Sequence, residues 1–199
     1  MAGQGCYRYQ FFEAIMRVAD LKYLKSNTAT SFAEALKMFL DTNCFALGPT
    51  EEWQEFRDNV WWCYETHKIL HANQRHLNKV YKSHFAPRKK YMNKMDCVEL
   101  MSKNNKIIPD ENKVTYCYGM SKMHVILETS QKQIYDEMKY VEFLEFLGRC
   151  AFAKYQDEEE THISEKLKWL LDELFPAFGV TRIEVEEEEE ELSESDPDY

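Results

Sequence analysis

Apolar residues recur at three- and four-residue steps through most of the chain, the spacing that gathers them on one face of an α-helix. Two stretches with this pattern also match each other in sequence. Residues 11–23 align with residues 143–155, and residues 32–41 align with residues 163–172 after a gap of one residue. In the first pair of segments Phe, Glu, Arg, Ala, Lys and Tyr recur at equivalent places. The match predicts a duplicated helix pair.

Between the two copies, an apolar stripe predicts one long helix from about Glu51 to His84, and Pro87 prevents its continuation. Such a helix either bridges two lobes or is a core helix with one buried face. The stripe has steps of three, four and once seven residues, and comprises Trp53, Phe56, Val60, Cys63, His67, Leu70, Leu77 and Tyr81.

After Pro87 the pattern shortens, predicting short helices over 94–101 and 112–119 before the strong helix of the second copy. Only six Gly and five Pro occur in 199 residues, which argues against an all-β fold. We therefore expect an all-α protein with two related lobes joined by a long helix. The expected divisions are a first helical repeat over 1–48, a connecting helix over 49–86, a second lobe over 87–182 and a disordered acidic tail over 183–199.

The acidity of the chain is confined to that tail. The formal net charge is -10, and the segment from Glu184 to Tyr199 holds ten acidic and no basic residues. The remainder carries 25 basic and 25 acidic residues, so its formal charge is zero and excludes no class of partner. The tail has too few apolar residues to form a core.

The pattern of cysteines and the hydropathy of the chain indicate the cellular compartment of the protein. The six cysteines are scattered, with no CxxC pair, as is typical of a reducing environment. No apolar run approaches the roughly 20 residues of a membrane helix. We expect a cytoplasmic protein with no membrane partner.

Candidate chemistry is sparse. Cys63, His67 and His71 are spaced by four residues on one expected helix and could face a metal, or simply pack there. Phosphate-binding and nucleophile-elbow motifs are absent from the sequence. A Cys–His enzyme stays an alternative, but the sequence favours no catalysis, no resident metal and no cofactor.

A basic run suggests a polyanion-binding edge. An acidic protein segment fits it, whereas nucleic acid is disfavoured because the RNA-binding sheet motif is missing. The alternatives are a solvated face and an intramolecular contact with the acidic run 186–191. The run comprises Arg75, Lys79, Lys82, Arg88, Lys89, Lys90 and Lys94.

The duplicated helices supply two further candidates. A Glu and an Arg recur four residues apart in both copies, an order that stabilises a helix and suggests a structural strut. Large apolar residues on the same helices are either core or a groove for a partner's amphipathic helix. These groove candidates are Phe11, Phe12, Phe143, Leu144 and Trp169.

The segment Tyr140–Glu145, Tyr-Val-Glu-Phe-Leu-Glu, resembles the start of an EF-hand exiting helix, with Met138 as the apolar loop residue and Glu142 as the last loop position. The resemblance implies a partner loop over residues 101–112, whose Ile108 would face Met138 in a two-strand bridge. The first repeat would be a partial EF-hand-like lobe.

The resemblance to an EF-hand does not extend to the residues that bind calcium. In the better loop, Gln131, Gln133 and Tyr135 occupy positions where calcium needs oxygen donors, and Asp136 replaces the turn glycine. The resemblance therefore implies a non-binding module, similar to those of axonemal and other microtubule-associated proteins. We expect an adaptor in a cytoskeletal, ciliary complex, with tubulin or other axonemal subunits as partners. The alternative is a calcium-responsive regulator aided by the acidic residues 157–160.

Overall fold

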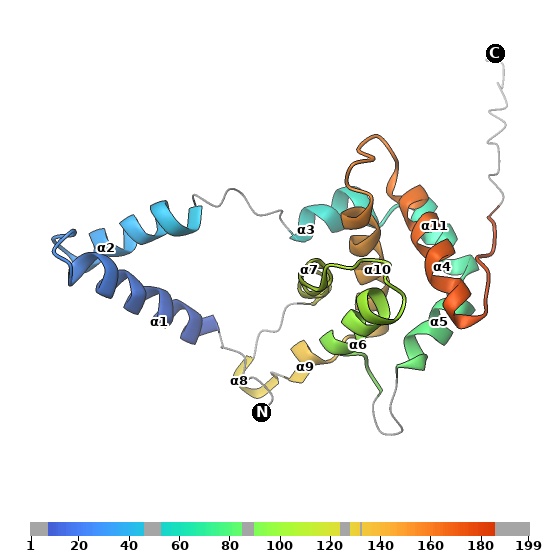
Figure 1. The fold of residues 1–199 in the computed structure, drawn as a ribbon, viewed down its shortest axis with the longest axis horizontal. Coiled ribbons are helices and arrows are strands. Elements are labelled where there is room, and N and C mark those ends of the chain that lie inside the picture. The colour runs from blue at the N-terminus through green and yellow to red at the C-terminus, as the bar shows by residue number, and fades with distance from the viewer. Residues whose placement is uncertain (1–7, 46–52, 85–89, 124–127, 132, 186–199) are drawn as a thin grey trace, which may run out of the picture. The chain divides into compact units, whose positions relative to one another are not determined.

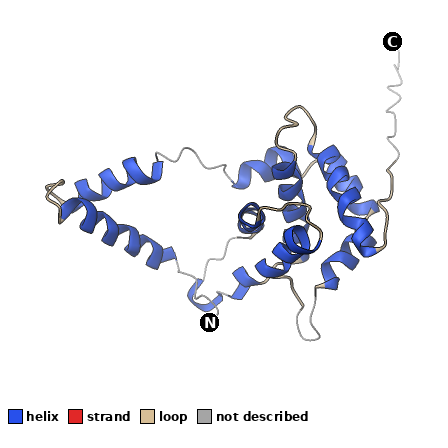
Figure 2. Ribbon diagram, viewed as in Figure 1, coloured by secondary structure: helices blue, strands red, loops and turns tan. Residues whose placement is uncertain are grey.

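The computed structural model of the protein describes residues 8–45, 53–84, 90–123, 128–131 and 133–185, and these residues are helical with connecting turns and no strand (Figure 2). The all-α prediction is confirmed. Among the described helices, none is both long and apolar enough to cross a membrane. In chain order (Figure 1) the α-helices are α1 (Arg8–Ala19), α2 (Phe32–Phe39), α3 (Trp53–Phe56), α4 (Tyr64–Ala72), α5 (Gln74–Ser83), α6 (Lys94–Val98), α7 (Glu111–Ser121), α8 (Glu128–Gln131), α9 (Gln133–Asp136), α10 (Tyr140–Lys154) and α11 (Ile163–Leu174).

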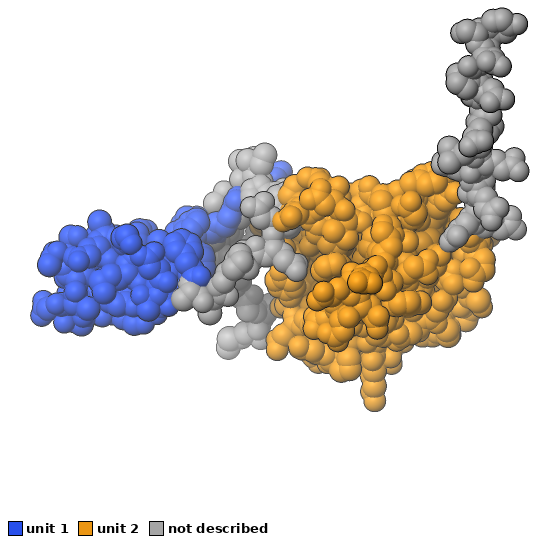
Figure 3. Space-filling view, turned by 90° about the horizontal axis from the view of Figure 1, so that it is seen from above, with its two compact units in different colours: residues 1–52, 125–132 blue, residues 53–124, 133–199 orange. Residues whose placement is uncertain are grey.

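Several helices continue in a turn of another type. The extensions are the π-helical turns η1 (Asp20–Leu24), η2 (Leu40–Cys44), η4 (Arg57–Trp61) and η5 (Glu99–Asn104) and the 3₁₀ turn η6 (Phe175–Phe178). The chain divides into two units, coloured separately in Figure 3. Unit 1 comprises residues 1–52 and 125–132, and unit 2 comprises residues 53–124 and 133–199.

Unit 1 contains the helix pair of α1 and α2. The Ser31 side chain caps α2 by accepting the Glu34 N–H at 3.2 Å, and the Glu34 carboxylate accepts the Thr30 N–H at 2.8 Å. Hydrogen bonds from the Thr30 side chain and backbone lower the pKa of Glu34. The buried core of the described part of unit 1 is small and consists of Tyr23, Ala29 and Ala35.

Unit 2 is built around α10, which packs against α7 and α11. Of the ten consecutive positions of α10 from Glu142 to Ala151, all except Leu144 are buried. Rings and aliphatic chains from the surrounding helices fill the space around Phe143, Phe146 and Leu147. A helix that is apolar on every side belongs inside a core rather than on a surface.

Gly148 marks the tightest packing around α10. A Cβ at this position would lie 2.4 Å from Cε3 of Trp61, whose side chain is fully buried. We expect Gly148→Ala to destabilise the protein by about 1–3 kcal/mol through overpacking. Gly119→Ala is the control, because a Cβ there meets nothing within 4 Å, and this helical site should gain about 0.5–1 kcal/mol. Urea unfolding of both variants measures the difference, and equal stabilities would contradict the close contact.

The expected single helix over 49–86 is instead divided, within its described residues 53–84, into α3 with η4, α4 and α5. Trp62 leaves the helical region with φ -85 and ψ 68, and Cys63 is extended. Asn73, at φ -97 and ψ 10, separates α4 from α5. These helices belong to unit 2 and their apolar residues enter its core, so they do not form a separate connector.

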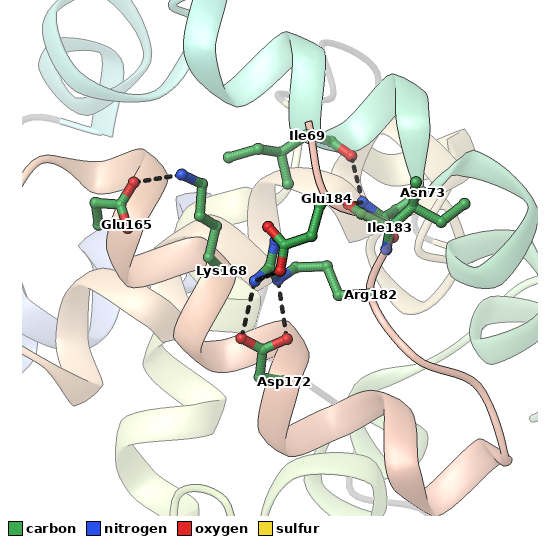
Figure 4. Close-up of polar contacts among 8 residues, drawn as sticks. All are labelled: Ile69, Asn73, Glu165, Lys168, Asp172, Arg182, Ile183 and Glu184. Carbon is green, nitrogen blue, oxygen red and sulfur yellow. Dashed lines mark hydrogen bonds and ion pairs between the residues drawn. The ribbon is translucent and has the colours of Figure 1, made fainter. Parts of the chain in front are cut away.

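Buried Asn73 also anchors the segment that leads into the acidic tail (Figure 4). Its Oδ1 accepts the Ile183 N–H at 2.8 Å, and its Nδ2 donates to the carbonyls of Ile69 and Ile183. Arg182 pairs with both Asp172 and Glu184, and hydrogen bonds to these carboxylates raise its pKa. The predicted tail, 183–199, therefore starts within a bonded segment, and residues 186–199 lie outside the described part.

A single antiparallel bridge joins Met92 to Met138, with the Met138 N–H donating to the Met92 carbonyl at 2.7 Å. The prediction that Ile108 faces Met138 is wrong. Residues 101–104 of the proposed partner loop are helical as part of η5, and Ile108 instead bonds back to Met101. The residue that faces Met138 lies just before α6.

Candidate functional site

The two predicted repeats have the same helical register. The second helix begins at Phe32 in unit 1 and at Ile163 in unit 2, which are equivalent positions in the alignment. The preceding residues, Ser31 and His162, both cap their helix through a side-chain acceptor. Two independent starts at one aligned position support the duplication.

A similar clasp ties the ends of each helix pair, although Asn43 of unit 1 and Glu173 of unit 2 are one position apart in the alignment. In unit 1, Lys22 Nζ donates to Asn43 Oδ1 at 2.5 Å, and Asn43 Nδ2 donates to the Tyr23 hydroxyl at 3.1 Å. The Lys22 ammonium also lies 5.2 Å from the centroid of the Tyr23 ring. The clasp holds the end of the first helix against the end of the second.

In unit 2, the equivalent Lys154 and Tyr155 side chains both bond the Glu173 carboxylate, the tyrosine hydroxyl at 2.6 Å. The Lys154 ammonium lies 5.2 Å from the Tyr155 ring centroid. Burial and the neighbouring Glu173 raise the pKa of Tyr155. Burial opposes ionisation of Glu173, but the bonds from Lys154 and Tyr155 outweigh it and lower the pKa of this carboxyl. The two pairs are thus alike in their internal contacts.

The two helix pairs differ in how far the first helix of each pair is buried. Phe143 is 0% exposed in α10, whereas the equivalent Phe11 is 56% exposed in α1. Cys150 is 0% exposed and its equivalent Val18 is 45% exposed. Within α1, Ala19 alone is fully buried. Most positions that are core in α10 therefore have exposed equivalents in α1, with Ala19 and Ala151 buried in both copies.

The covering of α10 comes from α3–η4 on one side. Arg57 Nε donates to Glu145 Oε2 at 2.7 Å, while Arg149 Nε donates to Glu145 Oε1 at 2.8 Å. All three side chains are buried. The Arg149 guanidinium lies 4.4 Å from the centroid of the Phe56 ring, a cation–π distance. The predicted strut is therefore part of a buried three-residue ion network.

The equivalent strut in α1 lies in water. Arg17 donates to Glu13 through Nε at 3.0 Å and through a terminal nitrogen at 2.6 Å, and both bonds fall on Oε1. Both side chains are at least half exposed. We call the exposed positions on this helix the bare α1 surface, which comprises Phe11, Phe12, Glu13, Met16, Arg17 and Val18.

The three groove candidates that lie in unit 2 do not form an exposed groove. Phe143 is wholly buried and its ring lies 5.3 Å from the Tyr81 ring, so it cannot grip a partner. Leu144 is partly buried against the same core. Trp169 is partly exposed but stacks edge-on against Tyr155 at 5.2 Å. The sequence did not distinguish these positions because equivalent apolar patterns occur in both copies.

The basic run is only partly described, since Arg88 and Lys89 lie outside the described residues. Arg75, Lys79 and Lys82 are exposed on α5, and Lys79 donates to the Phe178 carbonyl at 2.7 Å. Lys90 and Lys94 are exposed before and at the start of α6.

Among the described residues, Cys63, His67 and His71 do not form a ligand cluster. The His67 and His71 rings lie 6.0 Å apart on α4, whereas Cys63 lies with Glu65 and His162, ligand atoms within 4.8 Å of one another. The Cys63 thiol also contacts the Thr66 hydroxyl at 3.4 Å, and His162 Nδ1 is engaged in the α11 cap. These contacts explain why the three side chains lie close together, because they belong to the neighbouring starts of α4 and α11.

Comparison of the chain with family models, with curated proteins and with solved structures gave no match. Inference about function therefore depends on the residues themselves.

Proposed function

We propose that the protein is an adaptor that binds a partner's helices through the bare α1 surface. One observation carries this proposal: seven of the nine buried positions of α10 have exposed equivalents in α1. A helix with apolar residues on several sides is stabilised by covering helices. Exposed apolar clusters of this kind mark protein-binding surfaces. The described part of unit 1 buries only a small core, so a partner would add much to its stability.

The charge pattern of α10 indicates what the partner carries. Glu145 divides its two oxygens between Arg149 and Arg57, whereas both bonds that Arg17 donates to Glu13 fall on Oε1. We infer that Glu13 Oε2 accepts an arginine of the partner, as Glu145 Oε2 accepts Arg57. An aromatic ring beside that arginine would lie over Arg17, as Phe56 lies over Arg149.

The partner must differ from α3–η4 at one place. Met16 occupies the position equivalent to Gly148, where even a Cβ would collide with the Trp61 ring. A helix that covers α1 in the same way therefore carries a small residue where η4 carries Trp61. The expected partner segment contains an aromatic residue directly followed by an arginine. A small residue lies four positions after that arginine.

Photo-crosslinking tests this proposal on the full chain. A benzophenone amino acid replaces Phe12, and the crosslinked peptides from native extract are sequenced. We expect one partner helix containing the aromatic–arginine pair. Glu13→Lys should weaken its capture roughly 30-fold or more, because a charge pair desolvated at an interface is worth about 2 kcal/mol or more.

The control carries the photo-crosslinker at Lys37, an exposed α2 residue that pairs with Asp41 outside the bare α1 surface. It should not label the same helix. Crosslinks spread over unrelated proteins, or a yield unchanged by Glu13→Lys, would contradict the docking surface. Crosslinks to the chain itself would show that its own residues, or a second copy, cover α1.

We propose further that unit 2 contains two EF-hand-like motifs, α5–α6 and α7–α10. The Met92–Met138 bridge supports this pairing, and so do the matching bonds in which Asp96 and Glu142 each accept the backbone N–H three residues earlier, at the starts of α6 and α10. Asp96 and Glu142 are then the last positions of loops 85–96 and 131–142. The first loop has Phe, Pro and Lys at its first three ligand positions, so the motif serves as a scaffold.

The resemblance to axonemal and microtubule-associated modules supports a cytoskeletal, ciliary setting for this adaptor, with tubulin or other axonemal subunits as partners. A calcium-responsive regulator is the alternative. It predicts calcium-dependent capture of the partner, whereas the adaptor proposal predicts the same crosslinks with calcium or with a chelator.

A further inference from the structure

A carboxylate with no solvent exposure lies at the start of α10. Glu142 is 0% exposed, and both of its oxygens accept hydrogen bonds. Oε1 accepts the Met123 N–H at 2.8 Å, and Oε2 accepts the Lys139 N–H at 2.7 Å. Two neutral N–H groups leave a buried negative charge uncompensated, and an isolated buried charge is strongly unfavourable.

The compensating charge comes from Lys122, just after α7. Its Nζ donates to Glu142 Oε2 at 2.7 Å and to the Glu137 carbonyl at 2.5 Å. The Lys122 side chain is 6% exposed, and its ammonium lies 5.9 Å from the centroid of the Tyr118 ring. A lysine is rarely buried to this extent, so these oxygens must replace most of its hydration.

The two oxygen donors have a particular place in the loop. In a twelve-position calcium loop that ends at Glu142, the seventh position supplies a backbone carbonyl and the twelfth supplies a carboxylate. Glu137 is the seventh residue of loop 131–142 and Glu142 is the twelfth. The Met92–Met138 bridge supports this numbering independently, because it joins the eighth positions of the two loops. The ammonium thus bonds the groups that would otherwise bind an ion.

We infer that the Lys122 ammonium is a built-in cation, which fills the ion position of this loop and holds α7 and α10 together without calcium. This inference goes beyond partner docking, since it concerns unit 2 alone. Replacing Lys122 by a short apolar residue opens a latent cation site. The site takes a divalent cation or a small alkylammonium ion, both of which supply positive charge to Glu142 and the Glu137 carbonyl.

Thermal unfolding of the full chain tests this inference, with calcium chloride and methylammonium chloride as the probes. We expect millimolar calcium to leave the Tm of the wild type unchanged. Lys122→Ala should lower the Tm on the order of 10 °C, because it leaves a buried carboxylate unpaired. Either probe should recover part of this loss at an ionic strength matched with sodium chloride. The double variant Lys122→Ala/Glu142→Gln should show no recovery.

Lys113→Ala is the matched control, because Lys113 lies on α7, which Lys122 directly follows, and donates to the neutral oxygens of Ala153 and Gln156. Neither calcium nor methylammonium should change the Tm of Lys113→Ala by more than sodium chloride does at the same ionic strength. A calcium-induced rise in the wild-type Tm would overturn the inference, and so would an equal recovery in the double variant. If Lys122→Ala does not fold, Lys122→Gln and the calcium titration of the wild type test the inference in its place. Partner capture is measured separately, so either proposal can fail alone.

Discussion

Glu145→Ala is expected to cost roughly 3–5 kcal/mol in the free energy of unfolding of unit 2. The carboxylate is buried and bridges two buried guanidinium groups, those of Arg57 and Arg149. Removing it leaves two desolvated positive charges with reduced compensation. The Arg57 bond to the Ser121 carbonyl is long, at 3.4 Å, and a neutral carbonyl does not replace the charge of the carboxylate.

Glu13→Ala is the matched control from the other copy of the repeat. Glu13 and Arg17 are exposed, so their pair is worth about 0–0.5 kcal/mol. Urea unfolding followed by circular dichroism measures both variants. All four tryptophans lie in unit 2, so their fluorescence follows that unit separately. Equal and small effects of the two substitutions would mean that water reaches Glu145.

The sequence predicted the repeat well because its signal is local and occurs twice. Helical spacing indicated the elements, and the alignment set their register, in which the observed starts of α2 and α11 are equivalent. The alignment contains no information about neighbours, however. Phe11 and Phe143 stand in the same local pattern, and only the covering helices of unit 2 distinguish a core residue from a surface residue.

The breaks in the expected long helix depend on tertiary contacts. The apolar stripe continues in phase through Cys63 and the seven-residue step that spans Asn73, so periodicity alone favours one helix. The break at Asn73 is stabilised by its bonds to Ile69 and to Ile183, and the second partner is 110 residues away. No local sequence pattern predicts a contact between residues so far apart in the chain.

The bridging partner of Met138 did have a signal in the sequence. An apolar residue followed four positions later by an acid occurs at Met138 and Glu142, and again at Met92 and Asp96. Ile108 lacks this acid, because Asn112 follows it. Lys122 had no comparable signal, since its role depends on a carboxylate 20 residues later that is brought close by the fold.

Phe143→Ala and Phe11→Ala should separate stability from binding. Phe143 is wholly buried among Tyr81, Tyr140 and other core residues, so its truncation leaves a cavity and should cost about 3–5 kcal/mol. Phe11 is 56% exposed, and its truncation should change the stability of the free chain by no more than about 0.5 kcal/mol. Urea unfolding of the free chain measures both values.

The equivalence of the two positions makes the binding result informative. A partner that covers α1 as unit 2 covers α10 would bury Phe11 to the degree that Phe143 is buried. Phe11→Ala should then weaken photo-crosslinked capture by tenfold or more, since an anchor residue of this kind is worth at least about 1.4 kcal/mol. A variant that binds normally would show that the partner leaves Phe11 in water. The partner would then cover the side of α1 that carries Glu13 and Met16, as α3–η4 covers the side of α10 that carries Glu145 and Gly148.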